Sequence, residues 1–375
     1  MKKILYLTAV PWGWIKQRPQ FLAEVLSNSF EVDVFSKKSY AIKSSDLLNK
    51  AETQYNNLKL DSFRIFPFAA IPIIRHLHLG WINKLMLKFQ ISNINNYDII
   101  WVASASLYNL LKNRIKKNQI LIYDCMDDVL EFPGTKNSAK RTSICLRNEN
   151  QLLSDASLVF CSADYLKNKI VNRSGISAQK VMVVNNAIEV PNSLSEKPKE
   201  TRTNDIIQIL KSNKSLVYIG TIDEWFDFES VLHVLDNKTE LHMVLIGPMR
   251  GVLPRHERLH YMGTVPHDEI FHIMPHAFAL IMPFKLNELI RSVNPVKLYE
   301  YIYAGVPVIA TKYGETLKFN KYVNLYADKH DLLEIVSRII ENPITIDIED
   351  NRNFVNENTW KKRGEIINER LKVIK

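Results

Sequence analysis

The stretch FKLNELIRSVNPVKLYEYIYAGVPVIA, residues 284–310, contains the elements that decide the fold class of this chain. Asn294 is a favourable N-cap and Pro295 suits the first helical position, so a helix is expected over 296–304. Gly305 stands where a left-handed C-cap is expected, and the apolar run after it is of the kind buried in a parallel sheet. A loop, a helix, a glycine and a buried strand in this order predict an α/β protein.

The start of this helix has the groups of an anion site. Its free N–H groups and positive dipole end favour phosphate, and Arg291 and Lys297 add charge nearby. Glu300 lies about one turn further along and suits accepting hydrogen bonds from vicinal hydroxyls. A phosphate site beside a hydroxyl acceptor favours a nucleotide-diphosphate sugar as the ligand. The alternative is a surface ion pair between Lys297 and Glu300, which are three residues apart.

The length of 375 residues predicts two domains, because one ordinary core does not extend over so long a chain. Its three cysteines, Cys125, Cys145 and Cys161, include no close pair and therefore indicate neither a disulfide framework nor a metal cluster. Cys125 and Cys161 each end an apolar run, so we expect buried thiols and a cytoplasmic location. No secretory signal or membrane span is recognised, since the longest apolar run, 66–74, contains two prolines.

Charge is divided unevenly between the two halves. Residues 1–190 contain 25 Lys and Arg against 15 Asp and Glu, a balance of +10, whereas residues 191–375 contain 24 against 25, a balance of −1. This asymmetry favours an anionic acceptor or surface as a partner of the N-terminal half. A nucleic-acid partner is not favoured, because no recognised motif for it is present.

One basic, amphipathic segment in the first half, residues 64–88, bears on the partner of that half. Bulky apolar residues recur there at helical spacing, with Lys84 and Lys88 off their face. Such a helix either lies in the headgroup layer of an anionic membrane or packs its stripe on the sheet of its own domain. The stripe consists of Trp81, Ile82, Leu85, Met86 and Phe89.

Buried apolar runs alternate with helix-compatible stretches in both halves, which predicts two doubly wound parallel sheets facing a cleft. The expected domains are 1–188 and 205–355, with a linker at 189–204 and a final helix in 356–375. The expected strands are Lys3–Thr8, Glu31–Phe35, Ser62–Phe66, Ile99–Ala103, Gln119–Cys125, Ala156–Ser162, Val181–Asn185, Ser215–Gly220, His242–Gly247, Phe278–Phe284 and Val306–Thr311.

The order of several short motifs resembles the GT-B glycosyltransferases, in particular the retaining enzymes of family 4. The strongest match is Glu300 with Gly305, Pro307 and Val308, which is similar to the E-x4-G-x-P-V pattern of that family. The resemblance covers most of the chain, and the pieces together are more specific than any one of them. The others are Lys16–Gln20 with Leu22 and Ala23, Glu149 with Leu152 to Ala156, Asn185–Ala187, Gly220–Asp223, and Gly263.

The resemblance implies that the C-terminal domain binds a nucleotide sugar, the N-terminal domain binds the acceptor, and the final helix crosses back to the first domain. Glu300 would bind the donor ribose. Ser292 stands where the family has a first glutamate that contacts the donor sugar, so recognition of the sugar is altered. No metal is expected, because basic residues would replace it. The residues that would surround the donor diphosphate are Arg18, Gly220, Thr221, Arg291, Asn294 and Lys297.

Asp127 follows the fifth expected strand and is the candidate catalytic carboxylate, acting as a base for the acceptor or stabilising charge on the sugar. The alternative is that Asp127 or Asp128 caps the next helix. Trp12, Gly13 and Trp14 occupy the first loop, where they either contact the acceptor or the sugar or close the domain core.

The function expected from this resemblance is transfer of a hexose, with retention, to a glycan or lipid-linked saccharide in bacterial surface polysaccharide synthesis. Two alternatives share the fold and the ligand: a nucleotide-sugar epimerase, and an inactive module that binds a sugar nucleotide. An epimerase needs paired acid and base groups around one sugar, so analysis of products with and without an acceptor distinguishes it.

Overall fold

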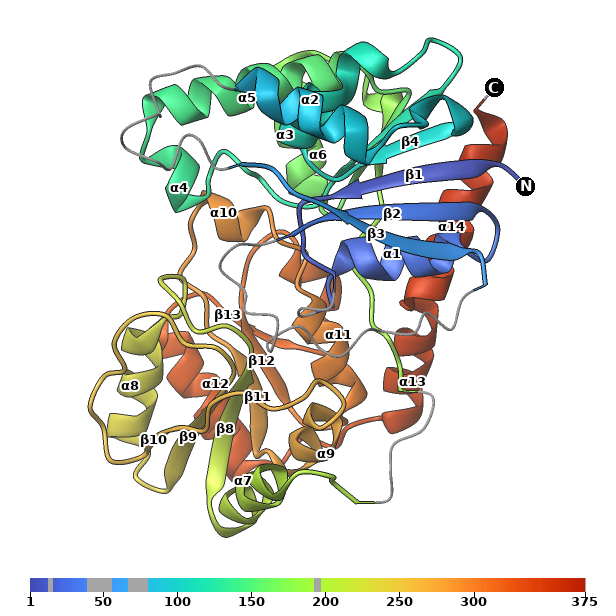
Figure 1. Ribbon diagram of the computed structural model, residues 1–375. Coiled ribbons are helices and arrows are strands. Elements are labelled where there is room, and N and C mark those ends of the chain that lie inside the picture. The colour runs from blue at the N-terminus through green and yellow to red at the C-terminus, as the bar shows by residue number, and fades with distance from the viewer. Residues whose placement is uncertain (13–15, 39–55, 67–79, 192–196, 375) are drawn as a thin grey trace. The chain divides into compact units, whose positions relative to one another are not determined.

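The chain folds into two compact units in a computed structural model that describes residues 1–12, 16–38, 56–66, 80–191 and 197–374 (Figure 1). Unit 1 comprises Met1–Asn185 and Trp360–Lys375, and unit 2 comprises Asn186–Thr359. Each unit has a parallel sheet with helices on both faces. The prediction of two doubly wound α/β domains is confirmed.

Unit 1 has a seven-stranded parallel sheet in the order β3-β2-β1-β4-β5-β6-β7. The strands are β1 Lys3–Thr8, β2 Glu31–Lys37, β3 Leu58–Phe63, β4 Ile99–Val102, β5 Ile120–Cys125, β6 Leu158–Cys161 and β7 Val181–Val183. The helices are α1 Arg18–Leu26, α2 Gly80–Gln90, α3 Ala105–Leu111, α4 Pro133–Lys136, α5 Ala139–Asp155, α6 Asp164–Ser174 and α14 Trp360–Val373, with short 3-10 turns η3 Ile94–Asn96, η4 Lys112–Arg114 and η5 Ala178–Lys180.

The strand order of unit 1 reverses between β1 and β4, and the strand residues explain why the sheet is covered on both faces. β4 and β6 are buried along their whole length, as expected for inner strands of a parallel sheet. Cys125 and Cys161 lie at paired positions of β5 and β6 and are both buried free thiols, as predicted. In Figure 1, α1 and α14 lie on one side of this sheet, and α2, α3, α5 and α6 lie on the other.

The C-terminal helix α14 belongs to unit 1 although the chain reaches it from unit 2. The ring of Trp360 stacks on Phe21 of α1 with centroids 4.8 Å apart. Gly364 lets the two helices approach closely, because a Cβ there would lie 3.0 Å from Cβ of Val25. The first unit therefore closes only when the last helix of the chain packs on its first.

Unit 2 has a six-stranded parallel sheet in the order β10-β9-β8-β11-β12-β13, which reverses between β8 and β11. The strands are β8 Lys214–Ile219, β9 Leu241–Ile246, β10 Leu259–Tyr261, β11 Ala279–Met282, β12 Val308–Thr311 and β13 Asn324–Tyr326. The helices are α7 Thr201–Ser212, α8 Phe228–Asn237, α9 Ile270–Ile273, α10 Glu288–Arg291, α11 Val296–Tyr303, α12 Lys329–Glu341 and α13 Ile348–Glu357, with η6 Met274–His276 and η7 Thr316–Phe319.

Two features of unit 2 differ from the sequence prediction. The edge strands β10 and β13 were not predicted, because each has three residues and only one of them is buried. Helix α7 begins at Thr201, inside the stretch predicted as a linker. Its first turn is polar, so the sequence did not indicate a helix there. The apolar face that packs against the unit comes later and is formed by Ile206, Ile207 and Leu210.

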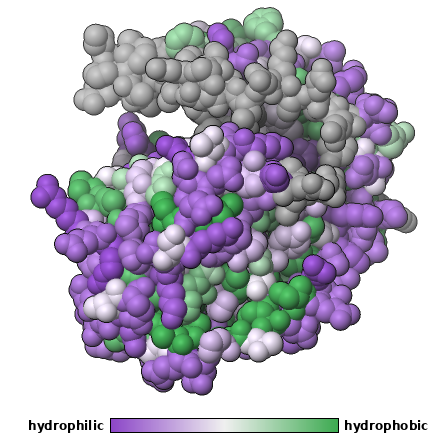
Figure 2. All heavy atoms as spheres, turned by 90° about the horizontal axis from the view of Figure 1, so that it is seen from below, coloured by the Kyte–Doolittle hydropathy of each residue, from purple (hydrophilic) through white to green (hydrophobic). Residues whose placement is uncertain are grey.

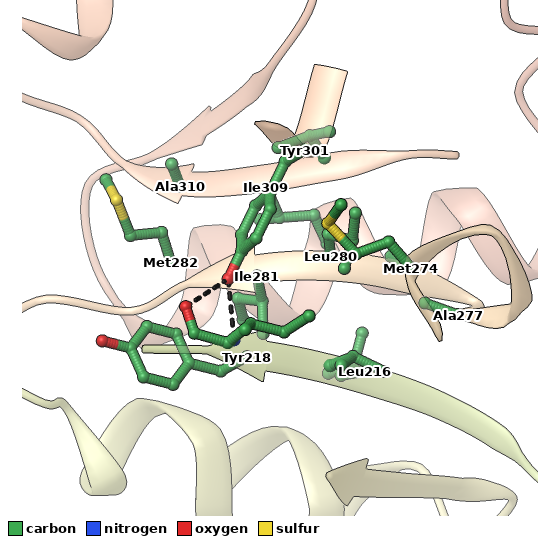
Figure 3. Packing of buried hydrophobic residues seen from close by; sticks show 14 of the residues in the cluster. Leu216, Tyr218, Met274, Ala277, Leu280, Ile281, Met282, Tyr301, Ile309 and Ala310 are labelled. Atoms are coloured by element: carbon green, nitrogen blue, oxygen red, sulfur yellow. Dashed lines mark hydrogen bonds between the residues drawn. The ribbon is translucent and has the colours of Figure 1, made fainter. Parts of the chain in front are cut away.

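The core of unit 2 joins α11 to the end of β8 (Figure 3). Tyr301 is fully buried, and its hydroxyl accepts a hydrogen bond from the Ile219 N–H at 2.8 Å and donates one to the Ile219 carbonyl at 3.3 Å. This contact fixes the second turn of α11 beside the carboxyl end of β8. On the face in Figure 2, by contrast, hydrophilic residues predominate and hydrophobic ones form small separate patches, as on an ordinary water-exposed surface.

Candidate functional site

Two glycines shape the carboxyl end of the unit 2 sheet. Gly220 follows β8 with φ +150°, and Gly247 follows β9 with φ +135°. A Cβ at Gly247 would lie 2.2 Å from the Gly220 carbonyl oxygen, so the two backbones pack in direct contact. A Cβ at Gly220 would lie 1.9 Å from Cε and 2.7 Å from Nζ of Lys297. The absence of a side chain at Gly220 therefore makes the space in which Lys297 lies.

Lys297, in the first turn of α11, is a half-buried cation without a counter-ion among the described residues. Its Nζ lies 5.9 Å from the centre of the Tyr218 ring. Burial lowers the pKa of Lys297, and the Glu300 carboxylate offsets part of this shift. The predicted alternative, an ion pair with Glu300, is not formed. Because a desolvated charge is costly unless it is paired, this ammonium is suited to receive an anion.

Glu300 lies one turn after Lys297 and contacts a residue that the sequence did not indicate. Its Oε1 is 2.7 Å from Nε2 of His267, and its side chain is 12% exposed. The imidazole of His267 is 55% exposed and packs edge-on against the Phe271 ring, with centroids 5.5 Å apart. His267 is 33 residues away in the sequence, in a loop, and no local pattern marks it.

Asn294 has a different role from the one predicted. The N-cap of α11 is Pro295, and Asn294 is buried one residue earlier. Its Oδ1 accepts hydrogen bonds from the Asn186 N–H at 3.0 Å and the Tyr299 hydroxyl at 3.3 Å, and its Nδ2 donates to Glu315 at 3.1 Å. Asn294 thus fixes the loop before α11 by its hydrogen bonds to other side chains and backbone of unit 2, and it does not cap the helix.

The other predicted donor residues divide between the surface and the interior of unit 2. Ser292 is fully buried and donates its hydroxyl to the Leu289 carbonyl at 2.7 Å, so it terminates α10. Arg291 is exposed, and its Nε lies 4.0 Å from the Glu288 carboxylate, which makes a loose ion pair at the surface. Thr221 is half-buried directly after Gly220, and its carbonyl accepts the Tyr218 hydroxyl at 2.8 Å. The structure thus brings together Gly220, Thr221, Lys297 and Glu300.

Arg18, in contrast, is committed to the interior of unit 1. It is 5% exposed, and its guanidinium donates to both oxygens of Asp124 at 2.8–3.2 Å and to the Val184 carbonyl at 2.7 Å. Asp124 is fully buried at the end of β5. The prediction that Arg18 binds the donor diphosphate is therefore replaced by a structural role, joining α1, β5 and the segment after β7.

Asp127, two residues after the end of β5, has the features of an acid or base. Its carboxylate is half-buried and forms no hydrogen bond or ion pair within the described part of the chain. Burial raises the pKa of Asp127 to about 6; Arg18 lowers it, whereas Asp124 and Asp128 raise it further. A carboxyl group that titrates near neutrality can exchange a proton with a substrate.

The alternative role of these carboxylates, capping the next helix, is not observed. The N-cap of α4 is Phe132. Asp128 instead accepts a hydrogen bond from the Leu130 N–H at 3.2 Å and pairs with Lys169 at 2.9 Å. Of the first-loop candidates, Trp12 is half-buried, whereas Gly13 and Trp14 lie outside the described residues.

Within the described ranges of the chain, no three His, Cys, Asp or Glu side chains are grouped in a way that would hold a metal ion. No helix in the same ranges combines the length and the apolar character needed to cross a bilayer.

Comparison with solved structures identifies the architecture. Anabaena Alr3699/HepE, solved in complex with UDP and glucose, matches with a TM-score of 0.71 over 99% of this chain and all of that one, at 16% sequence identity. The chain has the GT-B fold. An E. coli trehalose-6-phosphate structure bound with UDP-2-fluoro glucose matches over the whole of both chains, with a TM-score of 0.73 and 12% identity. Sucrose-phosphate synthase from Thermosynechococcus elongatus gives 0.70 and 14%, over 99% and 98% of the two chains.

Sequence comparison adds a partial relative to this structural result. The Bacillus subtilis (strain 168) protein named "Putative teichuronic acid biosynthesis glycosyltransferase TuaH" is 26% identical over 243 residues. The alignment spans 61% of this chain and 60% of the relative. No protein-family model matches the chain, so assignment to family 4 stays a prediction.

Proposed function

We propose that the protein is a glycosyltransferase that moves a sugar from a nucleotide-diphosphate sugar to a glycan or lipid-linked saccharide acceptor. The observation that carries the proposal is the half-buried, unpaired Lys297 at the carboxyl end of β8, with Glu300 beside it. In doubly wound sheets, ligands bind outside the carboxyl ends of the strands where the strand order reverses, and β8 lies at that point. The GT-B fold and the name of the partial relative point to the same activity.

The donor is expected to bind at the start of α11. Lys297 Nζ and the free N–H groups of the first turn would bind the diphosphate, on which negative charge develops as the glycosidic bond breaks. The Glu300 carboxylate would accept hydrogen bonds from the ribose hydroxyls. His267 Nε2 lies 2.7 Å from Oε1 of that carboxylate and donates to it in its Nε2–H tautomer, so it fixes the orientation of Glu300 and leaves the second oxygen for the ribose.

Three finer features belong to the same proposal. Asp127 would act as the acid or base of unit 1, with its raised pKa as support, in a transfer of a hexose with retention. The Lys297 ammonium and the α11 amides would neutralise the diphosphate without a divalent metal. The reaction would take place in the cytoplasm, on a precursor of a bacterial surface polysaccharide, as the name of the partial relative indicates for that protein.

The test is donor binding to the purified chain. Thermal-shift screening with UDP, GDP, dTDP and CMP sugars should give stabilisation with one nucleotide class, and EDTA should leave that shift unchanged. Lys297→Met and Glu300→Ala should each abolish it. Lys214→Met is the matched control, because this exposed lysine begins the same strand β8 at its opposite end. A donor shift that survives both site variants would contradict the assignment of these residues.

Turnover separates the transferase from the two alternatives that share the fold. Release of the nucleoside diphosphate that depends on an added acceptor supports transfer. Conversion of the donor sugar without an acceptor would indicate an epimerase. Tight donor binding without turnover over a broad acceptor panel would indicate a binding module.

A further inference from the structure

The helix α2 contacts unit 1 through two side-chain amides and a leucine. Asn83 accepts a hydrogen bond from the Phe66 N–H at 2.9 Å and donates to the Phe66 carbonyl at 3.0 Å. Gln90 forms the same pair with the backbone of Arg64, at 2.8 and 3.2 Å. Leu87 is 1% exposed between them. The backbone of residues 64–66 is therefore clamped along the inward face of α2, which leaves the opposite face of the helix outward.

That outward face is apolar. Trp81, Leu85 and Phe89 follow one another at four-residue spacing and are 61%, 45% and 75% exposed. Phe66, whose backbone is bound to Asn83 on the inward face, is 47% exposed and is not counted with this stripe. We refer to Trp81, Leu85 and Phe89 as the α2 surface. Of the five residues of the predicted stripe, these three are therefore exposed, whereas Ile82 and Met86 are half-buried. The buried positions of α2 are Asn83 and Leu87.

Positive charge flanks the α2 surface. Lys84 and Lys88 on the helix and Arg64 beside it are exposed, and none forms an ion pair within the described residues. The sequence contains no Asp or Glu between Asp61 and Asp98. An exposed apolar stripe with uncompensated cations along its edge is complementary to a surface that is apolar below and anionic above.

We propose that the α2 surface binds an anionic lipid bilayer, with α2 lying in the plane of the headgroup layer. Aromatic side chains are favoured at that depth, and lysine stems extend along the apolar layer while their ammonium groups reach the phosphates. Protein–protein interfaces are instead depleted of lysine. If a second copy of this chain bound here through the same surface, the cations of the two copies would face and repel one another. Charge complementarity therefore selects the membrane among the possible occupants.

This surface works independently of the donor site. Its residues lie in unit 1, and the groups assigned to the donor lie in unit 2. Attachment through α2 would hold the enzyme at a membrane that contains a lipid-linked acceptor, but the binding itself requires no acceptor and no donor. Failure of the membrane proposal would consequently leave the proposed transferase activity untouched, and the reverse also holds.

The experiment is co-sedimentation of the full chain with vesicles. Vesicles of phosphatidylglycerol and phosphatidylcholine in equal parts should bind the protein, and pure phosphatidylcholine vesicles should bind it weakly. Lys84→Ser/Lys88→Ser should lower the partition coefficient about 30-fold and reduce its salt dependence. Trp81→Ser/Phe89→Ser should lower it at least about tenfold, because the apolar side chains no longer enter the interface.

Matched controls separate this surface from charge and hydrophobicity in general. Lys361→Ser/Lys372→Ser removes two exposed charges from α14 in the same unit, and Val252→Ser removes an apolar side chain that is 93% exposed. Both controls should bind vesicles like the wild type, and every variant should keep the thermal shift given by the donor.

Three outcomes would overturn the proposal. The first is wild-type protein that ignores anionic vesicles or binds neutral ones equally well. The second is that the α2 variants and the α14 control lose binding equally. The third is that the α2 variants abolish self-association or capture of a protein partner in lipid-free solution while vesicle binding is unchanged, which would make the surface a protein interface.

Discussion

Gly220→Ala is predicted to disrupt donor binding while leaving the fold intact. The added methyl group would lie 1.9 Å from Cε and 2.7 Å from Nζ of Lys297, closer than any real contact. Both atoms are at the end of a flexible side chain, so Lys297 can swing away at little cost to the packing of unit 2. The ammonium would then no longer reach the anion that α11 is proposed to bind.

The size of the effect follows from the lost interaction. A hydrogen bond to a charged group contributes about 1.5–3 kcal/mol, which corresponds to a rise in the donor Kd of about 10- to 150-fold. The backbone at Gly220, with φ +150°, adds a folding cost of about 1–3 kcal/mol for any residue with a Cβ. Isothermal titration calorimetry with the nucleotide found by screening measures the first quantity, and urea unfolding measures the second.

Two further variants isolate the cause. Gly251→Ala places a methyl group at another positive φ, +109°, with nothing within 4 Å, and should therefore leave the Kd unchanged. Adding Gly220→Ala to Lys297→Met should raise the Kd no further, because Gly220→Ala weakens binding only by displacing the Lys297 side chain. A Gly220→Ala protein with wild-type affinity, or strictly additive effects in the double variant, would refute the reasoning.

Three more perturbations test other parts of the structure. Gly247→Ala should lower the urea midpoint far more than Gly251→Ala, because its methyl group would meet the Gly220 backbone oxygen at 2.2 Å; equal midpoints would contradict this packing. Asp124→Asn should destabilise unit 1 by about 3–5 kcal/mol, because it leaves the Arg18 guanidinium buried without a counter-ion; an unchanged unfolding curve would argue against the pair. For Asp127, whose pKa is raised to about 6, activity as a base should rise between pH 5 and 7 with a midpoint near 6, and Asp127→Asn should remove that step. The pKa of Asp127 is about 6 in the folded protein and 3.8 ordinarily, so the unfolded chain ionises first and wild-type stability falls as the pH rises from about 4 to 6. Asp127→Asn should therefore be more stable than wild type by up to about 2–3 kcal/mol at pH 8 and by little at pH 4.

The predicted strands show which part of the fold was accessible from the sequence. Inner strands such as β4 and β12 are fully buried, so they appear as continuous apolar runs. The edge strands β10 and β13 bury one residue each and carry no such signal. The alternation of strong runs was sufficient for the doubly wound class, because it depends on the inner strands and not on the edges.

The candidate site was predicted where its residues are close in sequence. Lys297 and Glu300 share one helical turn, so their proximity follows from helix geometry alone. Arg18 was misassigned because its partner, Asp124, is 106 residues away and removes it from solvent. His267 was missed for the same reason, since only the tertiary fold brings its ring to Glu300.

The amphipathic helix α2 shows most clearly what the sequence predicts and what only the tertiary structure decides. Periodicity identified the stripe of Trp81, Leu85 and Phe89, because side chains four residues apart share a face in any helix. Periodicity does not say whether that face packs inward or faces water. The hydrogen bonds of Asn83 and Gln90 to the neighbouring chain decided it, because they turn the polar side of the helix toward the unit.

The sequence by itself therefore determined the fold class, the helix that is proposed to bind phosphate, and the apolar stripe of α2 with its lysines. Each depends on residues within a few turns or strands of one another. Tertiary structure decided which charges are free and which are paired: Lys297 has space because Gly220 lacks a side chain, whereas Arg18 is neutralised by Asp124. The availability of a charge depends on what surrounds it in space, and those neighbours come from distant parts of the chain.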